Sequence, residues 1–301
     1  MNGIIIVNKE QGFTSHDVVA KLRGILHFKK IGHTGTLDPD ATGVLPVCVG
    51  KATKVCDLLT DRDKTYVAEV RLGVTTDTLD MTGKMISSAP VNITEEQLKL
   101  VLGEFTGEIQ QIPPMYSAVK VDGKRLYELA RQGREVERRA RKVVIHRLAL
   151  RETALERDEF TIEITCSKGT YIRSLCDDIG KRLGCGAAMK SLVRTGVGAF
   201  GLRDALTLAE IEQRAAASPA GGQDLLLPVD SVFQEYAACR VSEQGMKYLR
   251  NGNMVSHRLC QYDSPAADGE LVRMYDMDVC FYALYRFQED TGMYRAVKMF
   301  H

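Results

Sequence analysis

Residues 32–43 of the 301-residue chain read Gly-His-Thr-Gly-Thr-Leu-Asp-Pro-Asp-Ala-Thr-Gly, a polar loop whose best candidate for chemistry is Asp38. Three glycines and one proline within these twelve residues bend the backbone into a shape that most side chains would forbid. Pro39 also pushes Asp38 out of the helical region. A surface Asp-Pro turn explains this composition as well as an active-site loop does, because loops of this kind carry both.

The segments on either side of this loop carry strand and helix patterns. Ile4–Asn8 indicates a short buried strand, and apolar residues at helical spacing then follow a cap at Thr14 or Ser15, with Asp17 completing a capping box. The segment 65–73 alternates apolar and polar residues, which predicts a strand with one buried face. Because regular elements flank it on both sides, we expect loop 32–43 to hold its side chains in fixed positions.

A second strand and helix pair lies further along the chain. Apolar residues alternate over 160–166, and Thr170 then caps a helix that Gly184 ends. Arg173 falls in the first turn of that helix, where a cation opposes the helix dipole. This mildly unfavourable position predicts an anion beside Arg173.

Composition restricts the class of protein. With 45% hydrophobic and 26% charged residues, no long apolar run and no secretory signal pattern, we expect a globular cytoplasmic protein. The eight cysteines include no C-x-x-C pair and no histidines are paired at metal spacing, so we expect reduced, mostly buried thiols and no zinc site. Gly196–Gly201 has the spacing G-x-G-x-x-G, but no helix pattern follows it, and we discount a dinucleotide site.

Charge is unevenly distributed along the chain. Lys120–Arg147 contains ten basic and four acidic residues, whereas Asp204–Asp290 contains fourteen acidic and seven basic residues, although the whole chain has a net charge of only +1. A basic stretch of this density can neutralise several phosphates. The alternative is a solvated surface helix whose charges pair with one another.

Two domains account for these changes in pattern. Residues 1–230 form the larger one, interrupted by the basic stretch as an insertion over about 113–147. From about residue 237 short alternating runs predict a small β-rich module over 237–301.

Six long motifs follow one another along the chain: Gly32–Gly43, Lys64-Thr-Tyr66, Pro113–Lys120, Tyr127–Arg131, Cys166–Arg173 and Leu192–Gly196. Together they resemble the TruB family of tRNA pseudouridine synthases. The resemblance covers about residues 3–200 and then continues more weakly, and Glu10 departs from the proline that the family usually has there. It implies an α+β fold with a central, mostly antiparallel sheet flanked by helices, a thumb insertion and a small PUA-like RNA-binding domain.

The resemblance implies a reaction: isomerisation of uridine 55 in the T-arm loop of tRNA to pseudouridine, by a monomer that needs no cofactor and no protein partner. The uracil is detached, turned and rejoined through carbon, after being flipped out of the stack. Asp38 would be the catalytic carboxylate, and Arg173 would pair with it within about 4 Å and keep it ionised.

The resemblance also assigns roles to other side chains. Tyr66 would stack on the uracil near the sugar, Leu192 would form a wall of the site, and His33 would enter the space that the flipped base leaves. The remaining expected contacts to the substrate are Asp80, Lys64 and, from the thumb, Arg138, Arg139 and Arg141.

Two alternatives remain open from the sequence. One is a protein that binds or folds tRNA without catalysis, against which the joint presence of Asp38, Tyr66 and Arg173 weighs. The other is a guide-RNA-dependent synthase of a related branch, which would require partner proteins.

Overall fold

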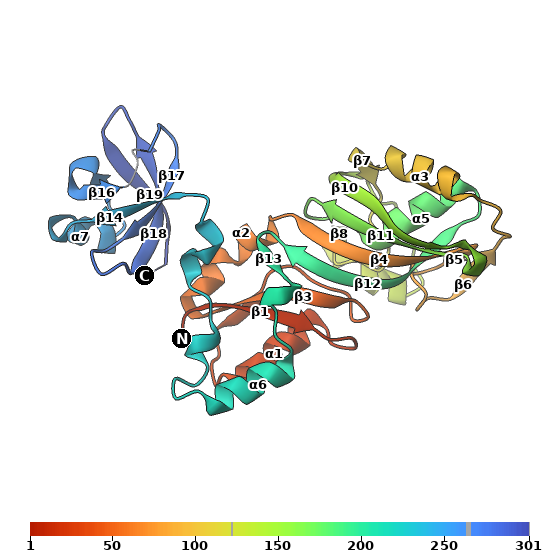
Figure 1. Ribbon diagram of the computed structural model, residues 1–301, viewed down its shortest axis with the longest axis horizontal. Coiled ribbons are helices and arrows are strands. Elements are labelled where there is room, and N and C mark those ends of the chain that lie inside the picture. Colours follow the sequence, from red (N-terminus) through yellow and green to blue (C-terminus); the bar gives the residue numbers. More distant parts are fainter. Residues whose placement is uncertain (122, 263–265, 301) are drawn as a thin grey trace.

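A computed structural model describes residues 1–121, 123–262 and 266–300. The chain forms a large sheet covered by helices and a smaller β-rich module at the C-terminal end (Figure 1). Within the described ranges no helix is both long enough and apolar enough to cross a membrane. Asp122, one of the acids in the basic stretch, and residues 263–265 and 301 of the predicted C-terminal module lie outside the described residues.

The central sheet has nine strands, seven of them in the order β1-β3-β12-β4-β11-β10-β7, with β2 beside β3 and β13 beside β12. All neighbours are antiparallel except β12 and β3, which run parallel. The prediction of a mostly antiparallel sheet is therefore confirmed. The strands are β1 (Gly3–Lys9), β2 (Ile31–His33), β3 (Thr42–Val49), β4 (Lys64–Leu72), β7 (Gly107–Gln111), β10 (Arg141–Ala154), β11 (Glu159–Cys166), β12 (Ala187–Val197) and β13 (Phe200–Gly201).

Strand alternation sets which side chains reach the core. In β4, Tyr66 and Ala68 face inward whereas Glu69 points to solvent, and β11 alternates in the same way. The inward face packs against α3 (Glu95–Glu104) and α5 (Ile172–Leu183) in one apolar cluster. Gly196–Gly201, discounted above as a dinucleotide site, pairs β12 with β13 in a tight turn.

Two further helices, α1 (Ser15–Ile25) and α6 (Leu208–Ala217), lie together against β1 and β3 (Figure 1). The predicted capping box at the start of α1 is present, because Thr14 and Asp17 exchange side-chain and backbone hydrogen bonds. The short helices α2 (Cys56–Thr60), α4 (Leu126–Arg131) and α7 (Glu243–Arg250) complete the set that the structure describes.

The start of α5 differs from the prediction. The residue that caps this helix is Tyr171 rather than Thr170, and its side chain makes no capping hydrogen bond. Gln111 from β7 instead holds the backbone of the cap residue: its Oε1 accepts from the Tyr171 amide at 2.8 Å, and its Nε2 donates to the Tyr171 carbonyl at 3.0 Å. A distant side chain thus fixes the helix start, which local sequence could not show. Gly184 ends the helix at φ 81°, as expected.

The inserted basic segment is shorter than the predicted 113–147. Strand β10 begins at Arg141 and pairs with β7 and β11, so residues 141–147 belong to the central sheet. Before it, β8 (Lys120–Val121) and β9 (Lys124–Arg125) form a small hairpin that leads into α4. A second hairpin, β5 (Val74–Thr76) with β6 (Met85–Ser88), projects beyond the end of β4.

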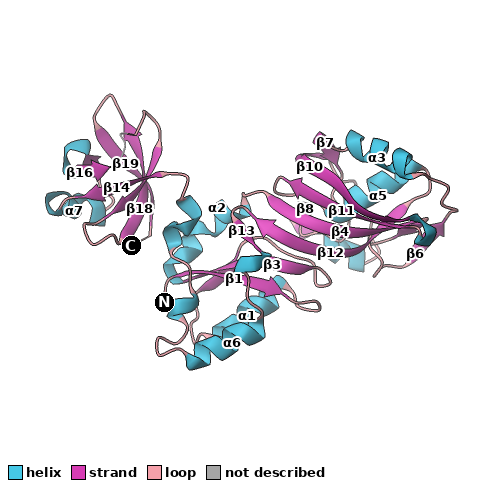
Figure 2. Cartoon of the chain, in the orientation of Figure 1, coloured by secondary structure: helices cyan, strands magenta, loops and turns pink. Residues whose placement is uncertain are grey.

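The C-terminal module consists mainly of strands, as Figure 2 shows in magenta. Its six strands run in the order β15-β19-β18-β17-β14-β16, and α7 packs against them. The rings of Phe233, Phe281 and Phe300 lie 5.3–6.0 Å apart and join this module to the apolar face of β1 and β3. The strands are β14 (Ala237–Val241), β15 (Val255–Ser256), β16 (Cys260–Tyr262), β17 (Leu271–Tyr275), β18 (Phe281–Gln288) and β19 (Met293–Met299).

Candidate active site

The loop that carries Asp38 is fixed from several sides. The Leu37 amide donates to Ser15 Oγ at 3.0 Å, and the buried ammonium of Lys9 donates to the Pro39 carbonyl at 3.0 Å. The Gly12 amide reaches the same carbonyl at 2.9 Å. The backbone around Asp38 is therefore held by α1 and by the end of β1, and Asp38 does not stand on a free surface turn.

Asp38 and Arg173 form the expected ion pair. Arg173 Nε lies 3.1 Å from Asp38 Oδ2, although 135 residues separate the two in sequence. A second carboxylate joins them, because Asp80 Oδ2 lies 3.2 Å from Arg173 Nη1. The two acids explain why a cation is stable in the first turn of α5.

The guanidinium is fully engaged. Its side chain is only 8% exposed, and it also donates to the carbonyls of Thr78 at 3.2 Å and Tyr116 at 2.9 Å. Asp80, only 13% exposed, accepts from the hydroxyls of Thr78 and Thr82 at 2.7 and 2.6 Å. Asp80 was expected to contact substrate, but in the structure its carboxylate is committed to holding Arg173 and its own loop.

Asp38 is the acid of this cluster that solvent reaches, because 44% of its side chain is exposed. Partial burial raises the pKa of Asp38 above its ordinary value, the Arg173 guanidinium opposes the rise, and the Asp80 carboxylate adds to it. Arg173 thus lowers the pKa of Asp38 as expected, but burial and the Asp80 carboxylate together raise it by more, so the net shift is upward. Asp38 is a more basic carboxylate than an exposed one.

Tyr66 and Leu192 lie next to the loop that carries Asp38. Both are nearly buried, at 9% and 8% exposed, and they share one apolar cluster with Leu37 of the loop. Burial raises the pKa of Tyr66, and the positive charge of the neighbouring Arg194 guanidinium opposes the rise. These two residues offer an aromatic ring and an aliphatic wall beside the loop that carries the carboxylate.

His33 lies at the end of β2, at the entrance to the loop. Its ring stands edge-on to the ring of His16, with centroids 5.0 Å apart, and its Nδ1 has no hydrogen-bond partner. Burial and the neighbouring His16 lower the pKa of His33, so the ring is neutral at pH 7. A neutral, half-buried ring suits contact with a base.

Lys64 does not reach the site. Its Nζ donates to the carbonyls of Thr60 and Arg62, both at 2.5 Å, and so closes the end of α2. Burial lowers the pKa of Lys64 to about 8. In this arrangement the donors of Lys64 serve the backbone, and its contact with substrate stays a prediction.

The three thumb arginines differ in their surroundings. Arg138 is partly buried and donates to the Pro113 carbonyl at 3.2 Å and to Glu135 Oε1 at 3.1 Å. Arg139 and Arg141 are exposed, and Arg141 stands at the first position of β10. Only these two present their charge to solvent.

Arg194 is the residue that the sequence did not assign. It belongs to the motif Leu192–Gly196, yet a buried arginine beside Tyr66 could be recognised only once β12 was paired with β4. The strand's alternation does contain a signal, because Leu192 and Arg194 are two apart and so share one face.

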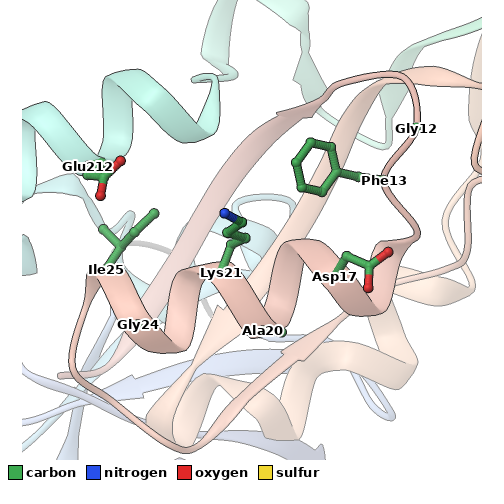
Figure 3. A pocket seen from close by; sticks show the side chains of 8 residues that line it. All are labelled: Gly12, Phe13, Asp17, Ala20, Lys21, Gly24, Ile25 and Glu212. Carbon is green, nitrogen blue, oxygen red and sulfur yellow. The ribbon is translucent and has the colours of Figure 1, made fainter.

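A shallow groove between α1 and α6 lies outside this cluster (Figure 3). None of the eight residues that line it contributes to the Asp38, Arg173 and Asp80 cluster, and its Asp17 is the capping residue of α1. Within the described ranges, moreover, no group of three or more His, Cys, Asp or Glu side chains is placed to hold a metal ion.

Comparison with known proteins defines the class. The chain belongs to the TruB family of pseudouridylate synthases, whose N-terminal domain model matches residues 23–172. The model described as the tRNA pseudouridylate synthase B C-terminal domain matches residues 173–234.

Individual relatives agree with this class. The chain is 50% identical over its full length to tRNA pseudouridine synthase B of Lachnoclostridium phytofermentans, all of which it covers, and 44% identical to that of Bacillus pumilus, with 84% of this chain and 82% of the relative covered. A solved Cbf5-Nop10-Gar1 complex contains a chain that superposes with a TM-score of 0.75 at 26% identity, with 99% of this chain and 85% of that chain covered.

Removal of the Asp80 carboxylate should affect how Arg173 is positioned for the reaction without affecting how tightly the RNA binds. We expect Asp80→Asn to slow single-turnover conversion of the substrate RNA roughly 100-fold while changing its Kd by less than about threefold, because Arg173 would lose a fixed partner. Asp77→Asn is the matched control: Asp77 lies on the same loop and is exposed, and among the described contacts its carboxylate accepts a hydrogen bond only from the Lys84 amide. Equal rates in the two variants would contradict this role of Asp80.

The raised pKa of Asp38 predicts a pH profile. If the ionised form reacts, the rate falls as pH drops through a value above the ordinary Asp pKa of about 3.9. Asp80→Asn should move this acid limb to lower pH, because the charge that raises the pKa of Asp38 is removed. The measurement is the single-turnover rate against pH, with His33→Gln as the control for titration of His33. A limb that disappears in His33→Gln would refute the assignment to Asp38.

Proposed function

We propose that this chain isomerises uridine to pseudouridine in tRNA, at position 55 of the T-arm loop, by a reaction that depends on Asp38. The observation that carries the proposal is the carboxylate of Asp38, partly exposed and paired at 3.1 Å with the buried Arg173 next to an apolar cluster. Membership of the TruB family and relatives named tRNA pseudouridine synthase B support the substrate class.

The reaction exchanges one bond for another. The bond between uracil N1 and the sugar carbon C1′ breaks, the ring turns, a C5–C1′ bond forms, and the C5 proton is replaced by one on N1. Asp38 acts on the base or sugar as the catalytic carboxylate, and Arg173 orients it. The raised pKa of Asp38 favours this role, because a more basic carboxylate is a better nucleophile and base.

The neighbouring side chains fit a flipped uridine. Tyr66 would stack on the uracil, Leu192 would close the site on its apolar side, and the neutral ring of His33 would fill the space that the base leaves. Flipping costs a few kcal/mol, which these contacts and the phosphate contacts must offset.

The thumb and the adjoining start of β10 would grip the T-arm by its phosphates. Arg139 in the thumb and Arg141, the first residue of β10, are exposed and free of described ion pairs, so their charges are available, whereas Arg138 would have to leave Glu135. We also propose that residues 237–301 form a PUA-like module, and that the protein is a cytoplasmic monomer that needs no partner protein. The lack of partner dependence separates it from guide-RNA-dependent synthases.

Mapping the modified position tests the proposal. Purified chain, incubated with a tRNA transcript without added metal, cofactor or other protein, should produce pseudouridine at position 55 alone. Asp38→Asn should abolish this product while changing the Kd for tRNA by less than about threefold, because the amide keeps the size of the side chain but cannot act as a base.

Three outcomes would decide among the candidate functions. Normal turnover by Asp38→Asn would end the proposal, and tRNA binding without turnover by the native chain would favour a protein that only binds or folds tRNA. Turnover only after partner proteins and a guide RNA are added would favour the related branch.

The thumb assignment makes a separate prediction. Arg139→Glu combined with Arg141→Glu should weaken tRNA binding and flatten the dependence of log Kd on log salt by about one unit for each phosphate that the thumb no longer neutralises. Arg157→Glu is the control, because Arg157 follows the opposite end of β10 and is also exposed to solvent. A salt slope unchanged from the native protein would remove this segment from the binding surface.

A further inference from the structure

Arg194 is a buried cation that has no acidic partner among the described residues. It is 1% exposed and heads the set of large, fully buried side chains. Its Nε donates to the Val44 carbonyl at 2.7 Å, and Tyr66 is the titratable neighbour that favours its charge. Among the residues that the structure describes, no carboxylate lies within 4.0 Å of its guanidinium, and its Nη2 has no hydrogen-bond partner.

Filling space does not account for such a residue. A buried charge whose partners are incomplete destabilises the fold, and an apolar side chain of similar volume would fill the same space at lower cost. The neighbouring charges do not help, because Lys9 and Lys64 are also cations and each is repelled by Arg194. The role of Arg194 therefore follows from the contacts that it makes and not from its volume.

Those interactions meet at the candidate active site. Arg194 on β12 stands directly opposite Tyr66 on β4, and side chains of such a cross-strand pair lie on one face. On its other side it pairs with Gly43 of β3, where the two backbones approach so closely that a Cβ on Gly43 would lie 2.2 Å from the Arg194 carbonyl oxygen. One residue thus touches Tyr66 and the end of the loop that carries Asp38.

We infer that Arg194 is a positioning residue for the proposed reaction: its guanidinium holds the Tyr66 hydroxyl and, through the Val44 carbonyl, the adjoining end of loop 32–43. The inference rests on the proposed function, because it concerns the part that Tyr66 plays there. A phenol has one proton and two lone pairs. When Arg194 donates to one lone pair, the hydroxyl proton and the other lone pair remain directed at the substrate.

A double-mutant cycle separates this role from a structural one. Single-turnover rates are measured for the native chain, Tyr66→Phe, Arg194→Lys and the double variant, on the tRNA transcript. We expect Arg194→Lys to slow the native reaction about tenfold but to change the rate of Tyr66→Phe less than about twofold, because the hydroxyl that Arg194 holds is already absent. Lysine keeps the charge but lacks the planar fork of donors. Additive effects would overturn the inference.

Val197→Ala is the matched control for reduced stability. Val197 is also fully buried on β12 and belongs to a different apolar cluster from Tyr66. Its effect should add to that of Tyr66→Phe, whereas tRNA Kd should stay within about threefold in every variant. Absence of turnover by the native chain in the same assay would instead indicate failure of the proposed function.

A spectroscopic measurement covers the case in which the Arg194 variants do not fold or Tyr66→Phe has no measurable rate. The guanidinium N–H signals of Arg194 are recorded in ¹⁵N-arginine protein, with and without Tyr66→Phe. Loss of the acceptor oxygen should shift an Arg194 signal and speed its hydrogen exchange. Signals that are identical in the two proteins would refute the contact and with it the inference.

Discussion

The buried guanidinium of Arg173 is the interaction on which the site depends. It joins three segments that are far apart in sequence: Asp38 from the loop before β3, Asp80 from the β5–β6 hairpin, and the Tyr116 carbonyl at the start of the thumb. Loss of Arg173 would leave the largely buried Asp80 carboxylate without its ion-pair partner, and breaking a buried pair in this way costs about 3–5 kcal/mol. Catalytic geometry and local stability are therefore tied to the same side chain.

Much of the fold followed from local patterns, and the site followed in part. Alternation identified β4 and β11, a capping box located α1, and a cation in the first turn of α5 indicated the anion that proved to be Asp38 together with Asp80. The resemblance to a family supplied the roles of these residues, which neither spacing nor composition could give.

The contacts that the sequence did not predict depend on how strands far apart in the chain align with one another. Arg194 meets Tyr66 because β12 pairs with β4 in one particular alignment, and Lys64 turns to two carbonyls because α2 ends beside it. The basic composition around Arg141 predicted an insertion, whereas in the structure this residue begins β10. Such outcomes are decided by partners that no short window of sequence contains, so periodicity alone cannot foresee them.

The aromatic contact among Phe233, Phe281 and Phe300 has a consequence for the whole molecule. These rings share an apolar cluster with Ile4 and Val44, so the C-terminal module and the β1–β3 end of the large sheet have one continuous interior. An ion pair between Lys298 and Asp57 at 2.7 Å reinforces the joint. The C-terminal module is thus held at a fixed distance and angle from Asp38. An RNA could contact both at once only if the distance between its two contacted parts matched this separation.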